Sequence, residues 1–330
     1  MADGPRISSS DKSAVNYALV AGHGRSGTDW LLELLDRAAT THCRNEPNEI
    51  SGNAFEALPS PFVALADPDA VAPLWSSAVA EAAAQMGERD RAPIVSKSHL
   101  ASWVKGFGLV KKLSSPRARR RWALIRPAWR RAEWPMPGLR GVPLTILKCN
   151  QVPGWARFVL EHDAGRGRVV QIVRHPGGFL SSWRQHYLAE DDAAEVRRAN
   201  VARLKQVARV DPAFAAVMGD PASHDLDESE LWYWRYSVEL IEAAGQASIP
   251  AQNAYHRILF EELALDPLEG TRELYGWLGL DWMPDIEESV VALSKGSLTI
   301  ARRAIEGLSA AERDTIDRVL SGSVMEHWWD

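Results

Sequence analysis

The sequence predicts a three-layer α/β domain, in which a parallel sheet is flanked by helices on both faces. Short apolar segments with the length of buried strands occur at residues 17–21, 144–148, 169–173 and 255–260. Helix-like segments that alternate with them lie near residues 28–39, 152–163, 177–189 and 230–245. Such alternation is typical of a parallel sheet. The chain has 330 residues, of which 46% are hydrophobic and 25% charged, so it can bury a sizeable core in one large domain or two.

The first predicted strand leads into a glycine-rich turn with the layout of a phosphate-binding loop. The run Gly22–Gly27, with the sequence GHGRSG, lies between this strand and a helix that starts near Thr28. Glycines let backbone N–H groups approach phosphate oxygens closely, and the helix N-terminus adds a favourable dipole. The turn is P-loop-like, but Thr28 replaces the lysine and Asp29 the magnesium-binding hydroxyl of the nucleoside triphosphate pattern. A P-loop kinase-like phosphotransferase is therefore the weaker alternative.

A second motif follows the strand predicted at residues 169–173. Arg174 ends this strand, Pro176 suits the first turn of the next helix, and Ser182 lies eight residues after Arg174. A guanidinium can hold two phosphate oxygens at once, which an ammonium cannot. This motif follows the first loop by about 150 residues, and the two are interpreted together.

Together the two motifs resemble those of the sulfotransferases. Enzymes of this family transfer a sulfuryl group from 3′-phosphoadenosine 5′-phosphosulfate (PAPS) and need no metal. The layout is most similar to that of carbohydrate and tyrosylprotein sulfotransferases, and we interpret the chain as a bacterial member. The resemblance implies a 3′-phosphate site at Arg174 and Ser182. It implies a 5′-phosphate loop formed by Gly24, Arg25, Ser26, Gly27, Thr28, Asp29 and Trp30.

Three further positions complete the implied PAPS site. Phe260 resembles the aromatic residue near the adenine, which is often Tyr in the family. Lys295 and Gly296 resemble the late basic loop that closes over the 3′-phosphate. Trp30 has two interpretations, stacking on the adenine or packing in the core, because it opens an apolar helix face. Asp29 departs from the family, which usually has Thr there.

The resemblance also suggests two catalytic residues besides Arg25, which is expected to contact the 5′-phosphate and the sulfuryl oxygens. Glu46 lies twenty-one residues after Arg25, at the spacing of a catalytic Glu in tyrosylprotein and several carbohydrate sulfotransferases, and is the predicted general base. Lys148 lies twenty-six residues before Arg174 and is predicted to stabilise the bridging oxygen as the S–O bond breaks.

Two alternatives for the base stay open. Glu49 lies three residues after Glu46. His99 resembles the catalytic His of cytosolic sulfotransferases, which would favour a small-molecule or tyrosine acceptor. It lies seventy-five residues before Arg174, whereas the family's stretch lies about two dozen residues before that position.

Residues 100–141 differ from the rest of the chain, and we interpret them as an insertion in a single domain that spans residues 15–330. The segment holds eleven Lys or Arg residues, four Trp and one acidic residue. It predicts a cationic surface for an anionic acceptor, a solvated basic helix pair packed on the main domain, or a membrane-docking surface. Residues 1–14 are polar and predict a disordered tail rather than a signal peptide.

The composition and net charge of the chain limit the classes of ligand and partner that we expect it to bind. A net charge of −5 gives no indication of nucleic-acid binding, and the two cysteines are too few for a disulfide framework. No His, Cys or Asp grouping has metal-ligand spacing. No run approaches the roughly 18 apolar residues of a membrane span, which favours a cytoplasmic enzyme. Fourteen Trp and the basic insertion favour a carbohydrate or glycolipid acceptor, which needs a hydroxyl to receive the sulfuryl group. A PAPS-binding adaptor without catalysis is the non-enzyme alternative.

Overall fold

The computed structural model describes residues 17–49, 52–84, 144–187 and 193–329. At its centre is a five-stranded sheet with the order β2-β3-β1-β4-β5, in which all neighbours are parallel. The strands are β1 Tyr17–Gly22, β2 Thr41–Asn45, β3 Leu144–Asn150, β4 Gly167–Val173 and β5 Tyr255–Leu259. The chain fills the sheet on one side of β1 first and then on the other. Ligands of such sheets bind at the carboxyl ends of the strands where the order reverses.

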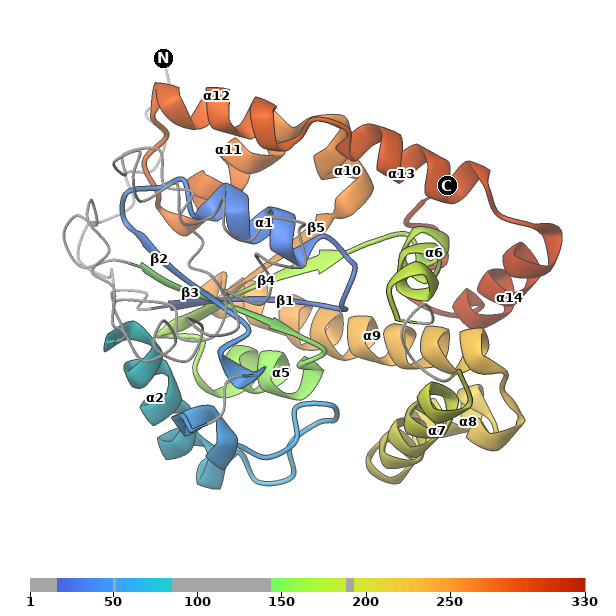
Figure 1. The fold of residues 1–330 in the computed structure, drawn as a ribbon. Coiled ribbons are helices and arrows are strands. Elements are labelled where there is room, and N and C mark those ends of the chain that lie inside the picture. The colour runs from blue at the N-terminus through green and yellow to red at the C-terminus, as the bar shows by residue number, and fades with distance from the viewer. Residues whose placement is uncertain (1–16, 50–51, 85–143, 188–192, 330) are drawn as a thin grey trace, which may run out of the picture.

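Helices cover both faces of the sheet, which confirms the predicted α/β architecture (Figure 1). Alternate residues of β1 face opposite cores, with Leu19 in one and Val20 in the other. The first core is closed by α2 Pro68–Ala84, α5 Pro153–His162 and α9 Leu226–Gln252. The second core is closed by α1 Thr28–Leu35, α10 Phe260–Leu265, α11 Pro267–Leu278, α12 Pro284–Leu293 and α13 Ser297–Glu306.

A third hydrophobic cluster lies beyond the carboxyl ends of the strands (Figure 1). It joins the N-terminal half of α9 to α6 Pro176–Tyr187, α7 Ala193–Val210, α8 Pro212–Met218 and α14 Ala310–Leu320. Helix α7 packs along α9 in this cluster, near the sheet edge from which the two predicted phosphate loops emerge.

Two elements differ from the sequence-based expectation. Strand β2 was not predicted, because its sequence THCRN has polar residues where a buried strand is expected to be apolar. Its side chains are nevertheless buried up to Arg44. Helix α2 begins at Pro68, whereas the Pro, Ala and Asp content of residues 57–73 predicts a loop there. The start is capped by Asp67, which accepts a hydrogen bond from the backbone N–H of Ala70 at 3.0 Å.

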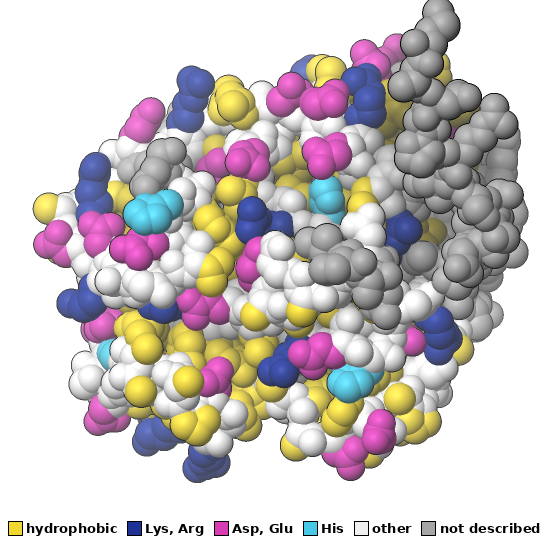
Figure 2. All heavy atoms as spheres, turned by 180° about the vertical axis from the view of Figure 1, so that it is seen from behind, with side chains coloured by type: hydrophobic (Ala, Val, Ile, Leu, Met, Phe, Trp, Pro, Cys, Tyr) yellow, Lys and Arg dark blue, Asp and Glu magenta, His cyan; other side chains and the backbone are white. Residues whose placement is uncertain are grey.

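Several predictions concern segments outside the described residues. These are the N-terminal tail, the insertion at residues 100–141 and His99. Among the described helices, none has the length and apolar character needed to cross a membrane. On the face shown in Figure 2, Lys and Arg side chains are interspersed with Asp and Glu instead of forming one basic patch.

Candidate functional site

The glycine-rich turn connects β1 to α1 and bends sharply at two residues. Arg25 has φ of 74° and Gly27 has φ of 95°, both in the left-handed region. The Ser26 N–H donates to the His23 carbonyl at 3.1 Å, which closes the turn. A Cβ on Gly27 would lie 2.6 Å from the ring of Phe260, so both the backbone angle and the ring require glycine here.

The second motif meets the first directly. Arg174 follows β4, and its Nη1 donates to the Arg25 carbonyl at 3.1 Å. The Arg25 Nε donates to the Ser182 Oγ at 3.2 Å. The Arg174 guanidinium also lies 4.7 Å from the centroid of the Phe260 ring. Four of the predicted PAPS-binding residues, separated widely in sequence, therefore form one contact network.

Two buried polar atoms in this network suit a phosphate ligand. The Arg174 Nε and the Ser26 Oγ are buried, and neither has a hydrogen-bond partner within the described part of the chain. An unsatisfied buried polar group costs about 1–3 kcal/mol. Burial is the main influence on the pKa of Arg174 and lowers it; Glu261 opposes this shift and Arg25 adds to it. A bound phosphate would supply acceptors for both atoms and a counter-charge for the guanidinium.

The remaining predicted PAPS contacts fall into two groups. Trp30 and Phe260 pack edge to face, with ring centroids 5.5 Å apart, so the helix-face aromatic borders the network. Lys295 and Gly296 form the turn before α13, a helix that packs on α6 and α10. In the ranges that the structure describes, neither residue has a hydrogen bond or ion pair to the phosphate loops. Their predicted role stays a prediction.

Lys148 and Glu46 meet at the carboxyl ends of β2 and β3. Asn45 is paired with Lys148 in the strand register, which places Glu46 directly after the pair. The Lys148 Nζ lies 2.7 Å from the Glu46 Oε1 and 2.8 Å from the Asp29 Oδ1. The ammonium is 1% exposed and so is held between two carboxylates. Asp29, which stands where the family usually has Thr, is thus held by its ion pair with Lys148.

Glu46 is fixed by its backbone as well as by its side chain. Its φ is 48°, in the left-handed region that non-glycine residues rarely adopt. Its N–H donates to the Lys148 carbonyl at 2.7 Å. Asn150 donates from its amide to the Glu46 Oε1 and accepts from the Thr28 hydroxyl at 3.0 Å. Asn150 therefore links the predicted phosphate loop to the predicted base, a role that sequence reasoning missed because the predicted strand ended two residues earlier.

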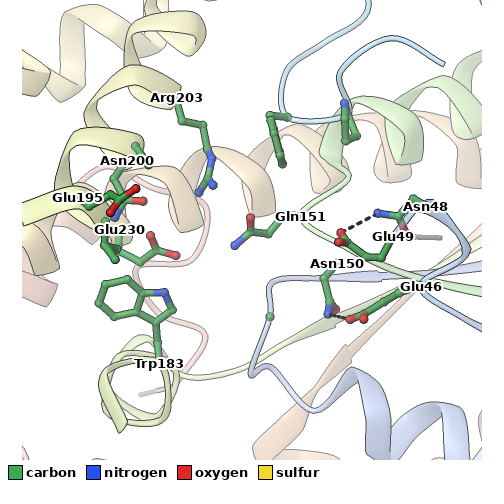
Figure 3. Close-up of a pocket in the computed structure, with 15 residues that line it drawn as sticks. Glu46, Asn48, Glu49, Asn150, Gln151, Trp183, Glu195, Asn200, Arg203 and Glu230 are labelled. Atoms are coloured by element: carbon green, nitrogen blue, oxygen red, sulfur yellow. Dashed lines mark hydrogen bonds between the residues drawn. The ribbon is translucent and has the colours of Figure 1, made fainter. Parts of the chain in front are cut away.

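A cavity of about 540 Å³ opens beside Glu46. Figure 3 shows Glu46, Asn48, Glu49 and Asn150 on one side and Trp183, Glu195, Asn200 and Glu230 on the other, with Gln151 between them. Gly24 of the phosphate loop lines the same cavity. The cavity is therefore continuous with the predicted phosphate loop and with the predicted base. Within the described ranges, no cluster of three or more His, Cys, Asp or Glu could hold a metal ion.

Comparisons with known proteins agree with the sequence motifs. A model described as "Sulfotransferase family" matches residues 18–284. No curated protein is significantly similar in sequence. Among solved structures, the sulfotransferase domain from the curacin biosynthetic pathway is 13% identical, with 93% of this chain and 96% of that one covered and a TM-score of 0.46. The sulfotransferase domain of the Synechococcus PCC 7002 olefin synthase is 17% identical, with 93% and 94% covered and a TM-score of 0.40. A sulfotransferase from Alicyclobacillus acidocaldarius is 17% identical, with 91% and 99% covered and a TM-score of 0.37.

Proposed function

Since the chain belongs to the sulfotransferase family and is a PAPS-dependent enzyme, we propose that Glu46 is the general base that deprotonates its acceptor hydroxyl. The observation that carries this proposal is the position of Glu46. Its carboxylate is held by Lys148 and Asn150 and lines the cavity beside the phosphate loop. A base must lie within hydrogen-bond reach of the proton that it takes, and a fixed carboxylate at the cavity wall meets this requirement.

The two loops bind the co-substrate through its phosphates. PAPS carries the sulfuryl group on its 5′-phosphate, and adenosine 3′,5′-bisphosphate is the leaving group. The turn from Gly24 to Gly27 and the first turn of α1 hold the 5′-phosphate, with the Ser26 hydroxyl as one donor. Arg174 and Ser182 hold the 3′-phosphate. Arg25 touches both residues of the second site, so it connects the two phosphate positions.

Lys148 provides positive charge where the bond to sulfur breaks. It lies between Asp29, in the first turn of α1, and Glu46, at the cavity. A preorganised ammonium in a buried site stabilises developing negative charge without reorganisation of solvent. We therefore propose that Lys148 stabilises the leaving oxygen and that the reaction needs no metal ion.

Glu49 suits the role of base less well. Glu49 is exposed, and its carboxylate accepts only a 3.3 Å hydrogen bond from Asn48 among the contacts described. Glu46 has lower exposure and two strong donors on one oxygen. His99 lies outside the described residues, so the cytosolic-type mechanism stays a prediction.

The acceptor class that we propose is a carbohydrate or glycolipid, because most of the cavity wall is polar and Trp183 lies at one side. We place the enzyme in the cytoplasm. Its two cysteines, Cys43 and Cys149, are buried and free, as suits the reducing compartment in which PAPS is made.

The test compares Glu46→Gln with the matched control Glu49→Gln at saturating PAPS and acceptor. The amide keeps the shape of Glu46 but cannot accept the proton, so kcat should fall about 10²- to 10⁴-fold with unchanged affinity for adenosine 3′,5′-bisphosphate. Glu49→Gln should retain near-normal kcat. If Glu49→Gln loses turnover and Glu46→Gln does not, the assignment of the base is wrong.

A further inference from the structure

The wall of the cavity opposite Glu46 contains polar groups for which the transfer step has no use. They come from α7, which supplies Glu195, Asn200 and Arg203, and from α9, which supplies Glu230. Figure 3 shows these side chains facing the cavity across from Glu46. They are placed to recognise the part of the acceptor that does not react.

Arg203 is held in place by aromatic rings instead of by a carboxylate. Its guanidinium carbon lies 4.9 Å from the centroid of the Phe62 ring and 4.5 Å from that of Tyr233. No ion pair of Arg203 is found in the described part of the chain. Ring contacts fix the plane of a guanidinium but leave the N–H donors on its edge available. Arg203 can therefore donate two parallel hydrogen bonds to a ligand in the cavity.

Glu230 is a buried carboxyl at the same wall. Its side chain is 1% exposed, and its Oε1 lies 3.3 Å from the His23 Nε2. This contact lacks hydrogen-bond geometry, and the oxygen has no hydrogen-bond partner among the described residues. Burial raises the pKa of Glu230 to about 7, against the opposing effects of Arg203 and Asn200. Burial and Arg203 lower the pKa of His23 to about 3, so the ring is neutral and provides no counter-charge.

The cavity carries side chains of both charge signs, so a charged acceptor of either sign would meet a like charge inside it. An anion would meet the carboxylates of Glu46, Glu49 and Glu195. A cation would meet Arg203, whose charge no described ion pair neutralises. Nine of the fifteen lining residues carry an amide, carboxyl or guanidinium group, which suits hydroxyl groups better than an aromatic ring. The volume of about 540 Å³ is within the range of small-ligand pockets.

We propose that Arg203 and Glu230 form an acceptor-recognition pair for two neighbouring hydroxyls of an uncharged polyhydroxyl compound, such as a neutral sugar ring. The guanidinium donates to hydroxyl oxygens, and the carboxyl accepts from hydroxyl hydrogens. Gln151 and Asn200 extend the same pattern along the cavity. This inference rests on the proposed sulfuryl transfer at Glu46 and narrows its acceptor. It makes the net charge of the acceptor, and not only its hydroxyl, a determinant of specificity.

The experiment uses labelled PAPS with pyranoside acceptors that differ mainly in charge, together with a neutral aromatic acceptor that lacks the polyhydroxyl ring. The probes are neutral methyl pyranosides of glucose, galactose and mannose, their uronates, their 2-amino counterparts, and an uncharged phenol. We expect the highest kcat/KM for a neutral pyranoside. A higher value for a uronate, an amine or the phenol overturns the proposal, as does turnover of the phenol alone. Binding of adenosine 3′,5′-bisphosphate without turnover of any of these hydroxyl compounds counts instead against the proposed reaction, and with it this inference.

Variants of Arg203 separate recognition from a purely structural role. Arg203→Met keeps the stem but loses the donors, so KM for the best neutral pyranoside should rise about 10- to 100-fold with a smaller change in kcat. The preference for the neutral ring over its amine counterpart should also fall, because the repelling charge is gone. Arg203→Lys should show the wild-type preference for the neutral ring, but its KM should lie between those of the wild type and Arg203→Met. Arg209→Met, on an exposed position of the same helix, is the control and should match the wild type.

A structural role would give a different result. If Arg203→Met lowers the melting temperature and the affinity for adenosine 3′,5′-bisphosphate, while the neutral-to-amine preference stays as in the wild type, the recognition role is overturned. Arg203→Lys keeps the ring contacts and the charge, so it separates these outcomes even if Arg203→Met folds poorly.

Discussion

At the proposed phosphate end of the site, Arg25 contacts both Arg174 and Ser182. At the proposed acceptor end, by contrast, Arg203 and Glu230 form no ion pair with each other among the described contacts. The phosphate end is therefore assembled before ligand binds, apart from individual buried atoms such as the Arg174 Nε. The acceptor end is held by ring contacts and burial, and its polar groups face the cavity. In our proposal the phosphate end binds the same co-substrate, PAPS, in every reaction, and the acceptor end selects the acceptor.

Lys148, Glu46 and Asn150 lie between these two ends. The Thr28 hydroxyl contacts Asn150, which contacts Glu46 at the cavity wall. A short chain of hydrogen bonds thus connects the proposed phosphate loop to the proposed general base. If the two ends act separately, a change at one should alter one binding constant and leave the other unchanged.

The largest expected effect is at the phosphate end. Arg174→Ala removes a bidentate partner from a buried phosphate, and affinity for adenosine 3′,5′-bisphosphate should fall by about 2–5 kcal/mol in calorimetry. KM for the acceptor at saturating PAPS should change little. The control is Arg157→Ala, an exposed arginine in an ion pair of α5, which should bind normally because such pairs contribute about 0–1 kcal/mol. Undiminished affinity in Arg174→Ala would remove the assignment of the 3′-phosphate site.

The sequence predicts a function for this end because each proposed phosphate motif is contiguous. The run from Gly22 to Thr28 and the run from Arg174 to Ser182 each form one strand–turn–helix unit. A phosphate-binding role for the turn glycines and the strand-end arginine can therefore be predicted without knowledge of distant contacts. The parallel sheet was predictable for the same local reason, since four of its strands are apolar.

The acceptor end could not be predicted in this way. Arg203 and Glu230 are single polar residues on α7 and α9, and only the packing of these helices brings them together. Strand β2 was missed because its polar side chains are buried by tertiary contacts. The position of Glu46 followed from family spacing, but its partner Asn150 requires the register of β2 against β3.

A second prediction uses pH to test how deeply the acceptor end is buried. The pKa of Glu230 is raised to about 7 in the folded state, so the folded state holds this proton more tightly than the unfolded chain. This contribution to stability decreases as pH rises from about 4.5 to about 7. The pKa of His23 is lowered to about 3, so its contribution increases with pH between about 3 and about 6.5. The two contributions oppose each other over their shared range.

Glu230→Gln should remove the contribution of Glu230 to the pH dependence of stability and leave that of His23. Relative to the wild type, the free energy of unfolding of the variant should increase from pH 4.5 to pH 7, by about 3 kcal/mol if the full pKa shift applies. Urea unfolding at several pH values measures the difference. Glu288→Gln, which alters an exposed carboxylate on α12, is the control. A pH-independent difference between Glu230→Gln and the wild type would show that this carboxyl is hydrated, and the contrast between the two ends would weaken.

The smallest expected effect concerns the basic insertion at residues 100–141. Its measurement tests whether this insertion contributes to acceptor binding. An uncharged acceptor has no long-range attraction to Arg119, Arg120 and Arg121, so replacing all three by Ser should leave its KM nearly unchanged. Salt should have equally little influence, although exposed charges are screened within about 10 Å at 0.1 M and about 3 Å at 1 M ionic strength. The measurement is KM for the best neutral pyranoside across this range, in the wild type and the triple variant, with affinity for adenosine 3′,5′-bisphosphate as the control. A KM that rises with salt in the wild type and loses this dependence in the triple variant would mean that the insertion attracts an anionic acceptor. Specificity would then depend on the insertion rather than on Arg203 and Glu230.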